Sequence, residues 1–106
     1  MNTDELSNAT VKAAIDALQN GDKEAWTALF TVDAELYDDG KPRSLALFTQ
    51  QALGHERFTS IDRVDRHGLE LIGGFHSDTW GDFRTYFRFR LVASGKIERL
   101  DIGQAD

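Results

Sequence analysis

The stretch GDFRTYFRFRLVASGKIERLDIGQ, residues 81–104, decides the fold. Between Phe83 and Leu91, apolar residues and Thr85 alternate with arginines and a tyrosine. A period of two residues is typical of a strand with one buried face and one exposed face. The run Ala-Ser-Gly-Lys at 93–96 is a turn signal, and residues 97–104 are rich in apolar residues again. We therefore predict a long C-terminal hairpin of two strands.

Three segments before this hairpin have the pattern of amphipathic helices. The apolar residues Val11, Ala14, Ile15 and Leu18 share one helix face, and Gly21 suits the end of that helix. Aspartate and serine are favoured at the position that precedes a helix, because their side chains accept hydrogen bonds from its first turn. The helices are predicted over residues 4–20, from the cap Asp22 to Phe30, and from the cap Ser44 to Gly54.

Shorter strands complete the predicted fold. They are expected at residues 34–38, 58–66 and 69–77. The last is interrupted by Gly73-Gly74, which usually marks a bulge or a sharp bend. The order α-α-β-α-β-β-β-β over a single domain, residues 1–106, predicts an α+β fold. Three helices would cover one face of a strongly curved, mostly antiparallel sheet, forming a cone with a pocket at its open end.

Composition excludes several classes of function. The 106 residues carry a formal net charge of −6, which argues against binding to nucleic acids or anionic membranes. No apolar run has transmembrane length, and the acidic N-terminus is unlike a signal peptide, so we expect a cytoplasmic protein. There is no cysteine, and the three histidines lack metal-ligand spacing. We therefore expect no metal and no other cofactor.

The chain resembles the nuclear transport factor 2-like superfamily, whose members include ketosteroid isomerases and SnoaL-like polyketide cyclases. The resemblance lies in VKAAIDALQNGD, ALFTVDAELYDD, and FRF followed by GKIERLDIG, and it spans residues 8–104. It implies a cystatin-like α+β cone. This superfamily mixes enzymes, small-molecule binders and interaction domains, so the fold does not give the function.

The resemblance also implies roles for single residues. The catalytic aspartate of the family's isomerases corresponds to Asp38. Their tyrosine oxyanion donor corresponds to Ala14, and their protonated acid corresponds to Thr85, or to Phe87 if the hairpin has no gap. The base is therefore kept and both donors are absent, which argues against steroid isomerisation.

Asp38 and His76 are the candidate catalytic residues. Strand alternation puts Asp38 on the same inward face as Ala34 and Leu36. Burial of a carboxylate raises its pKa, which suits a general base or acid. The alternative is an aspartate that caps the following turn. His76 lies near the open end of the sheet, where it or Tyr37 would assist Asp38, but its face depends on the register at Gly73-Gly74.

The predicted ligand contacts are bulky or lie on the inner strand faces. They are Trp26, Phe30, Phe48, Thr85, Phe87, Leu100 and Ile102. Pockets in small folds are mainly apolar and aromatic. Tyr86, Arg88 and Arg90 lie on the opposite face of the hairpin, where we expect a homodimer interface, since arginine and tyrosine are enriched at interfaces. The alternative for this face is a solvated surface with cross-strand ion pairs.

Two functions follow from these patterns. The first is cofactor-free acid–base catalysis of the isomerase, cyclase or dehydratase type on a small apolar molecule, with Asp38 as the base. The second is a non-catalytic homodimer that binds a small apolar ligand or a protein partner. The missing donors at positions 14 and 85 favour the second, and the inward Asp38 favours the first.

Overall fold

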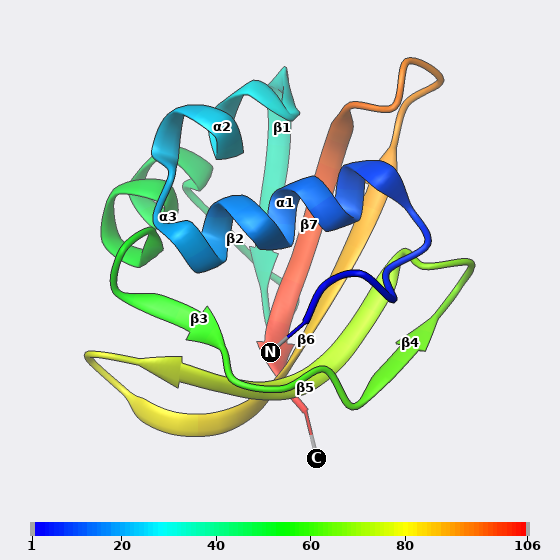
Figure 1. The fold of residues 1–106 in the computed structure, drawn as a ribbon. Coiled ribbons are helices and arrows are strands. Elements are labelled where there is room, and N and C mark those ends of the chain that lie inside the picture. The colour runs from blue at the N-terminus through cyan, green and yellow to red at the C-terminus, as the bar shows by residue number, and fades with distance from the viewer. Residues whose placement is uncertain (1, 106) are drawn as a thin grey trace.

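The computed structural model describes residues 2–105. Within this range, three helices and seven strands form an α+β arrangement with a single sheet. Figure 1 shows the sheet curving around the helices, which lie against one of its faces. This confirms the predicted fold class. No helix among these residues is both long and apolar enough to cross a membrane.

The three helices each begin at a capping side chain. Asn8, Asp22 and Ser44 accept hydrogen bonds from the backbone N–H groups three residues further on. The helices are α1 (Ala9–Asn20), α2 (Lys23–Ala28) and α3 (Leu45–Ala52). α1 is therefore shorter than the predicted 4–20, because Asn8 sets its start. α2 ends before Phe30, which begins a strand instead of completing a helix face.

The strands form one sheet in which the first and last are neighbours. They are β1 (Phe30–Asp38), β2 (Lys41–Arg43), β3 (Glu56–Phe58), β4 (Arg63–Asp65), β5 (Glu70–Ser77), β6 (Gly81–Leu91) and β7 (Ile97–Gln104). The order is β2-β1-β7-β6-β5-β3, and β4 also pairs with β5. β1 runs parallel to β7, and every other pair is antiparallel. The predicted hairpin is confirmed: Thr85, Phe87 and Phe89 are buried, and Arg84, Arg88 and Arg90 are exposed.

A two-residue loop joins β1 to β2 in a tight hairpin. Asp39 and Gly40 form a two-residue loop with φ angles of 50° and 82°. Such positive angles are those of the turns that join twisted antiparallel strands. Asp38 then pairs with Lys41, and Leu36 pairs with Arg43. The hairpin thus puts Arg43 on the same sheet face as Asp38.

The sequence predicts that Gly73-Gly74 interrupts its strand, but β5 is continuous through this glycine pair. β5 pairs with β6 without a register shift from Glu70 to Ser77. The interruption lies instead in the neighbouring segment of the sheet, where β3 and β4 replace the single strand predicted at residues 58–66. A Cβ on Gly73 would lie 2.0 Å from the backbone oxygen of Ser60. The glycines therefore allow the segment between β3 and β4 to cross β5 closely.

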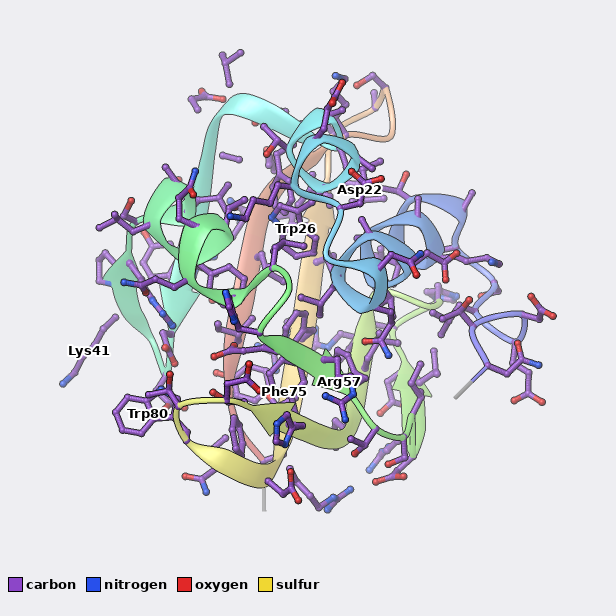
Figure 2. All side chains as sticks on the ribbon, turned by 60° about the vertical axis from the view of Figure 1, so that its left-hand side comes forward. Asp22, Trp26, Lys41, Arg57, Phe75 and Trp80 are labelled. Atoms are coloured by element: carbon purple, nitrogen blue, oxygen red, sulfur yellow. The ribbon has the colours of Figure 1, made fainter. Side chains whose placement is uncertain are left out.

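Aromatic side chains fill the space between the helices and the sheet. Trp26 is fully buried, and its indole Nε1 donates a hydrogen bond of 3.1 Å to Thr49 Oγ1. Phe58 packs edge-on against Phe75 and Phe87, with ring centroids 5.1 and 4.9 Å apart. Figure 2 shows Trp26 in the interior and the other tryptophan, Trp80, at the edge of the molecule.

Candidate ligand cavity

A cavity of about 480 Å³ opens beside the β1–β2 hairpin, α3 and the turn between β5 and β6. One part of its wall is apolar and mostly aromatic. These residues are Phe48, Phe75, Trp80, Phe83, Phe87 and Ile102. Another part is polar, and it consists mainly of charged side chains. These residues are Asp38, Asp39, Arg43, Glu56, Asp82 and Thr85. The cavity can therefore surround an apolar body while offering charged groups to a polar one.

Asp38 lies on the cavity wall and is paired with Arg43. The Nη1 of Arg43 donates a hydrogen bond of 2.9 Å to Oδ2 of Asp38. Their side chains are 38% and 34% exposed, respectively. Two further contacts fix the guanidinium: Nη2 lies 3.2 Å from Gln51 Oε1, and the group stacks 5.1 Å from the ring centroid of Phe48. Asp38, which the sequence analysis expects to be buried, is thus a partly exposed member of an ion pair.

His76 does not share the cavity with Asp38, contrary to the expected pairing. Because β5 keeps its register, Phe75 and Ser77 point inward and His76 points to the other face of the sheet. Its Nδ1 lies 2.7 Å from Asp82 Oδ1, and its Nε2 lies 3.1 Å from Asp78 Oδ1. Hydrogen bonds to Asp82 and then Asp78 raise the pKa of His76. The reciprocal bonds from His76 and His55 lower the pKa of Asp78.

Only some of the predicted ligand contacts line the cavity. Phe48, Thr85, Phe87 and Ile102 do so. Three others lie in the core: Trp26, Phe30 and Leu100. Trp26 and Phe30 pack against each other with ring centroids 5.0 Å apart, so they hold α2 against β1 instead of facing a ligand. The Thr85 hydroxyl donates a hydrogen bond of 2.6 Å to the backbone oxygen of Gly103.

Arg43, Glu56 and Trp80 are among the cavity residues that the sequence analysis does not predict. Arg43 had a usable signal, because Asp-Gly between two extended segments favours a two-residue hairpin. That hairpin puts position 43 diagonally across from position 38 on the same face. Trp80 sits in the β5–β6 turn with 77% of its surface exposed, and Glu56 begins a strand of only three residues. Neither position has a periodic pattern that predicts its direction.

The residues of the predicted interface lie on the outer face of β6 and have partners within the chain. Arg88 Nε lies 2.5 Å from Glu70 Oε2, and Arg90 Nε lies 3.2 Å from Glu98 Oε2. The ring of Tyr86 packs over Gly103, where an added Cβ would meet it at 2.6 Å. Burial and the nearby charge of Asp39 raise the pKa of Tyr86. The face thus has the cross-strand ion pairs of a solvated sheet surface, together with a large aromatic ring.

Comparisons with known proteins identify likenesses in structure. No protein-family model matches the sequence, and a search of curated proteins finds no relative. A nuclear transport factor 2-like protein of unknown function from Cytophaga hutchinsonii is 13% identical, with a TM-score of 0.73 over 91% of this chain and 87% of that one. A candidate polyketide cyclase from Sinorhizobium meliloti is 19% identical, with a TM-score of 0.71 over 96% of this chain and 99% of that one.

A carotenoid-binding protein is also similar. The Orange Carotenoid Protein of Anabaena sp. PCC 7120, solved with canthaxanthin, is 20% identical, with a TM-score of 0.70. The match covers 90% of this chain and 35% of that longer one. Several of the similar structures are described as having a cystatin-like fold. At these identities the likeness lies in the fold.

Proposed function

We propose that this chain, which has the cystatin-like fold of the nuclear transport factor 2-like superfamily, binds a small and largely apolar molecule in its cavity. The observation that carries the proposal is the cavity itself. Its volume of about 480 Å³ lies in the range of sites for small organic ligands, and much of its wall is aromatic.

The Asp38–Arg43 pair would orient the ligand. The carboxylate offers an acceptor and the guanidinium offers donors, and the two groups lie 2.9 Å apart on the wall. A hydroxyl or carbonyl group of the ligand can reach both, while its apolar body faces Phe75 and Phe83. The Anabaena protein solved with canthaxanthin and the candidate polyketide cyclase support a small organic ligand by analogy of fold.

Cofactor-free acid–base catalysis with Asp38 as the base is the second candidate function. The position of Asp38 on the cavity wall favours it. Such a reaction also needs hydrogen-bond donors that stabilise an oxyanion, and neither expected donor position offers a free one. Ala14 is buried in α1, and the Thr85 hydroxyl is already bonded to Gly103. Arg43 is the donor beside Asp38, so a catalytic version of the site would use this pair. Ligand binding without chemistry requires fewer groups, and we favour it.

We also propose that two copies of the chain associate through the outer sheet face around Tyr86. Arg88 and Arg90 already have carboxylate partners in their own chain. In a dimer, these pairs would be shared with the second copy, and the exposed part of the Tyr86 ring would supply apolar contact.

Tryptophan fluorescence tests the binding proposal. Trp80 is exposed at the cavity whereas Trp26 is buried, so a ligand in the cavity should change the emission of Trp80. The probe is 2-naphthalenemethanol, with binding also followed by calorimetry. An Ile102→Trp variant, which places a larger side chain in the cavity wall, should lose binding while thermal melting shows that it folds. Equal binding to both proteins would refute a site in this cavity.

A further inference from the structure

We propose that the cavity selects an organic cation, a protonated amine carried on an aromatic or alicyclic body, over a carboxylate or a phosphate. This inference rests on the proposed function, since it names the chemical class of the ligand for the same cavity. It comes from the charges that line the cavity, from the groups that neutralise them, and from the aromatic rings beside them.

The charges on the cavity wall are unbalanced. Four carboxylates line it, from Asp38, Asp39, Glu56 and Asp82, and the only cationic side chain among the lining residues is Arg43. Arg43 is already paired with Asp38 at 2.9 Å. Asp82 is paired with His76 on the other face of the sheet, with Oδ1 and Nδ1 2.7 Å apart, so its charge is directed away from the cavity. An anionic ligand would therefore meet an excess of negative charge, which the net charge of −6 of the whole chain reinforces.

Glu56 carries the charge that is free for a ligand. Across residues 2–105, it has no cation within ion-pair distance, and its Oε2 accepts a hydrogen bond of 2.9 Å from the hydroxyl of Ser77, which is 1% exposed. Ser77 is neutral, so it orients the carboxylate without cancelling its charge. Asp39 lies at the edge of the cavity, where its Oδ1 accepts a long bond of 3.3 Å from the backbone N–H of Gln104 and lies beside the Tyr86 ring on the outer sheet face.

Two hydrogen bonds through Ser77 connect Glu56 to the turn that carries Trp80. The backbone N–H of Trp80 donates a bond of 3.1 Å to Ser77 Oγ, whose own proton goes to Glu56. The turn that carries the exposed Trp80 ring is thereby held at a fixed place relative to this carboxylate. An amine bound near Glu56 can therefore place its apolar body against the Trp80 ring.

The aromatic wall gives the cation a second source of attraction. A protonated amine is drawn to the face of an aromatic ring, most strongly to tryptophan. The cavity already holds one such contact, because the Arg43 guanidinium stacks 5.1 Å from the ring centroid of Phe48. Acidic residues alone would not define a site. Here they lie in an aromatic-walled cavity, and this combination suits an amine with an apolar body.

Three probes of one shape and different charge test the inference. They are 2-naphthalenemethylamine, 2-naphthalenemethanol and 2-naphthoic acid, titrated at pH 7 and low ionic strength by calorimetry. We expect the amine to bind about tenfold more tightly than the alcohol, which is the gain of roughly one cation–π or charge contact. The acid should bind more weakly than the alcohol. Added salt should reduce the difference between amine and acid.

Variants then locate the source of the preference. In the Glu56→Gln variant, the ratio of amine to alcohol affinity should fall several-fold. The matched control is Asp33→Asn, which removes one charge from an exposed position outside the cavity lining and should leave the ratio unchanged. Equal affinity for amine and alcohol, or a preference that survives Glu56→Gln, would overturn the inference and leave the binding proposal intact. If none of the three probes binds, both proposals fail.

Discussion

Arg43 Nη1 donates a hydrogen bond to Asp38 Oδ2 across the β1–β2 hairpin, at 2.9 Å. This contact changes the chemistry expected of Asp38. A lone carboxylate in an apolar pocket would act mainly as a proton acceptor. A carboxylate beside a guanidinium forms a fixed pair of acceptor and donor, which suits the recognition of a neutral polar group. The hairpin loop Asp39-Gly40 is the local cause, because its two-residue length sets the register that brings position 43 next to position 38.

The first prediction is that Asp38→Asn weakens ligand binding more than it weakens the fold. Both side chains of the pair are more than a third exposed, so losing the ion pair should lower the free energy of unfolding by less than about 1 kcal/mol. The amide keeps the shape but presents a weaker acceptor to the ligand. Calorimetry with 2-naphthalenemethanol and urea denaturation measure the two effects. A loss of several kcal/mol in stability would instead indicate a structural role.

The second prediction concerns the glycine pair in β5. Gly73→Ala should lower the free energy of unfolding by about 3 kcal/mol, since its Cβ would lie 2.0 Å from a backbone oxygen of Ser60. Gly74→Ala is the matched control. Its nearest neighbour is the side-chain Oγ1 of Thr59 at 2.7 Å, which can rotate away, so the loss should be nearer 1 kcal/mol. Urea denaturation compares them, and equal losses would contradict the close crossing.

Much of the fold follows from patterns within single segments. The alternation at residues 83–91 and the capping side chains Asp22 and Ser44 depend only on local chemistry, and the structure confirms them. The split of the predicted strand 58–66 into two short strands depends on a contact with another strand. This contact is possible because Gly73 and Gly74 have no side chains, whereas the sequence pattern predicts a bulge or a sharp bend in β5 itself.

The site was harder to predict for the same reason. Alternation alone puts Asp38 on the inner face, and the structure agrees. The face of His76 depends on the register of β5 at Gly73-Gly74, which the sequence leaves open, and the unbroken register puts this candidate catalytic residue on the other face. Alternation also does not show whether an inward-facing residue lies in the core or on the cavity wall. Trp26 and Phe87 have similar apolar character, yet only Phe87 reaches the cavity wall.

The third prediction concerns the hydrogen bond between Trp26 and Thr49 in the core. Thr49→Val removes the acceptor of the buried indole N–H at nearly constant volume, and it should cost about 1–3 kcal/mol of stability. Thr49→Ser keeps the hydroxyl and is the control, which should cost less. Thermal melting gives the stability, and Trp26 emission reports on the indole. If valine proves as stable as serine, the bond contributes little to the fold.

The fourth prediction concerns the proposed dimer. Sedimentation at micromolar concentration should give twice the chain mass of 11.9 kDa. Replacing Arg88 and Arg90 together by alanine should weaken association at least about tenfold, since both contribute charge to the proposed interface. Lys23→Ala in α2, on the helix side, is the control and should leave the dimer unchanged. A native monomer, or a dimer insensitive to the double variant, would rule out this interface.

The last prediction is that stability falls as pH rises above 6.5 and that His76 is responsible. Each ring nitrogen of His76 faces a carboxylate, and only the doubly protonated ring can donate to both Asp82 and Asp78. Arg57, opposite His76 on β3, acts the other way, but the pKa is still raised above its ordinary value of 6.5. A raised pKa stabilises the fold fully below the unfolded value of 6.5. That stabilisation is lost as pH rises through the folded pKa.

Asp78 sets the lower end of the pH range in which its contact with His76 stabilises the fold. Its pKa is lowered from 3.8, so its contribution is present above that value and is lost as pH falls through the folded pKa. Urea denaturation from pH 5 to pH 9 should therefore give a decline above pH 6.5 that His76→Gln removes, because glutamine does not titrate. His67→Asn, in the turn between β4 and β5, is the control and should keep the decline. A decline that persists in His76→Gln would assign the pH dependence to another group.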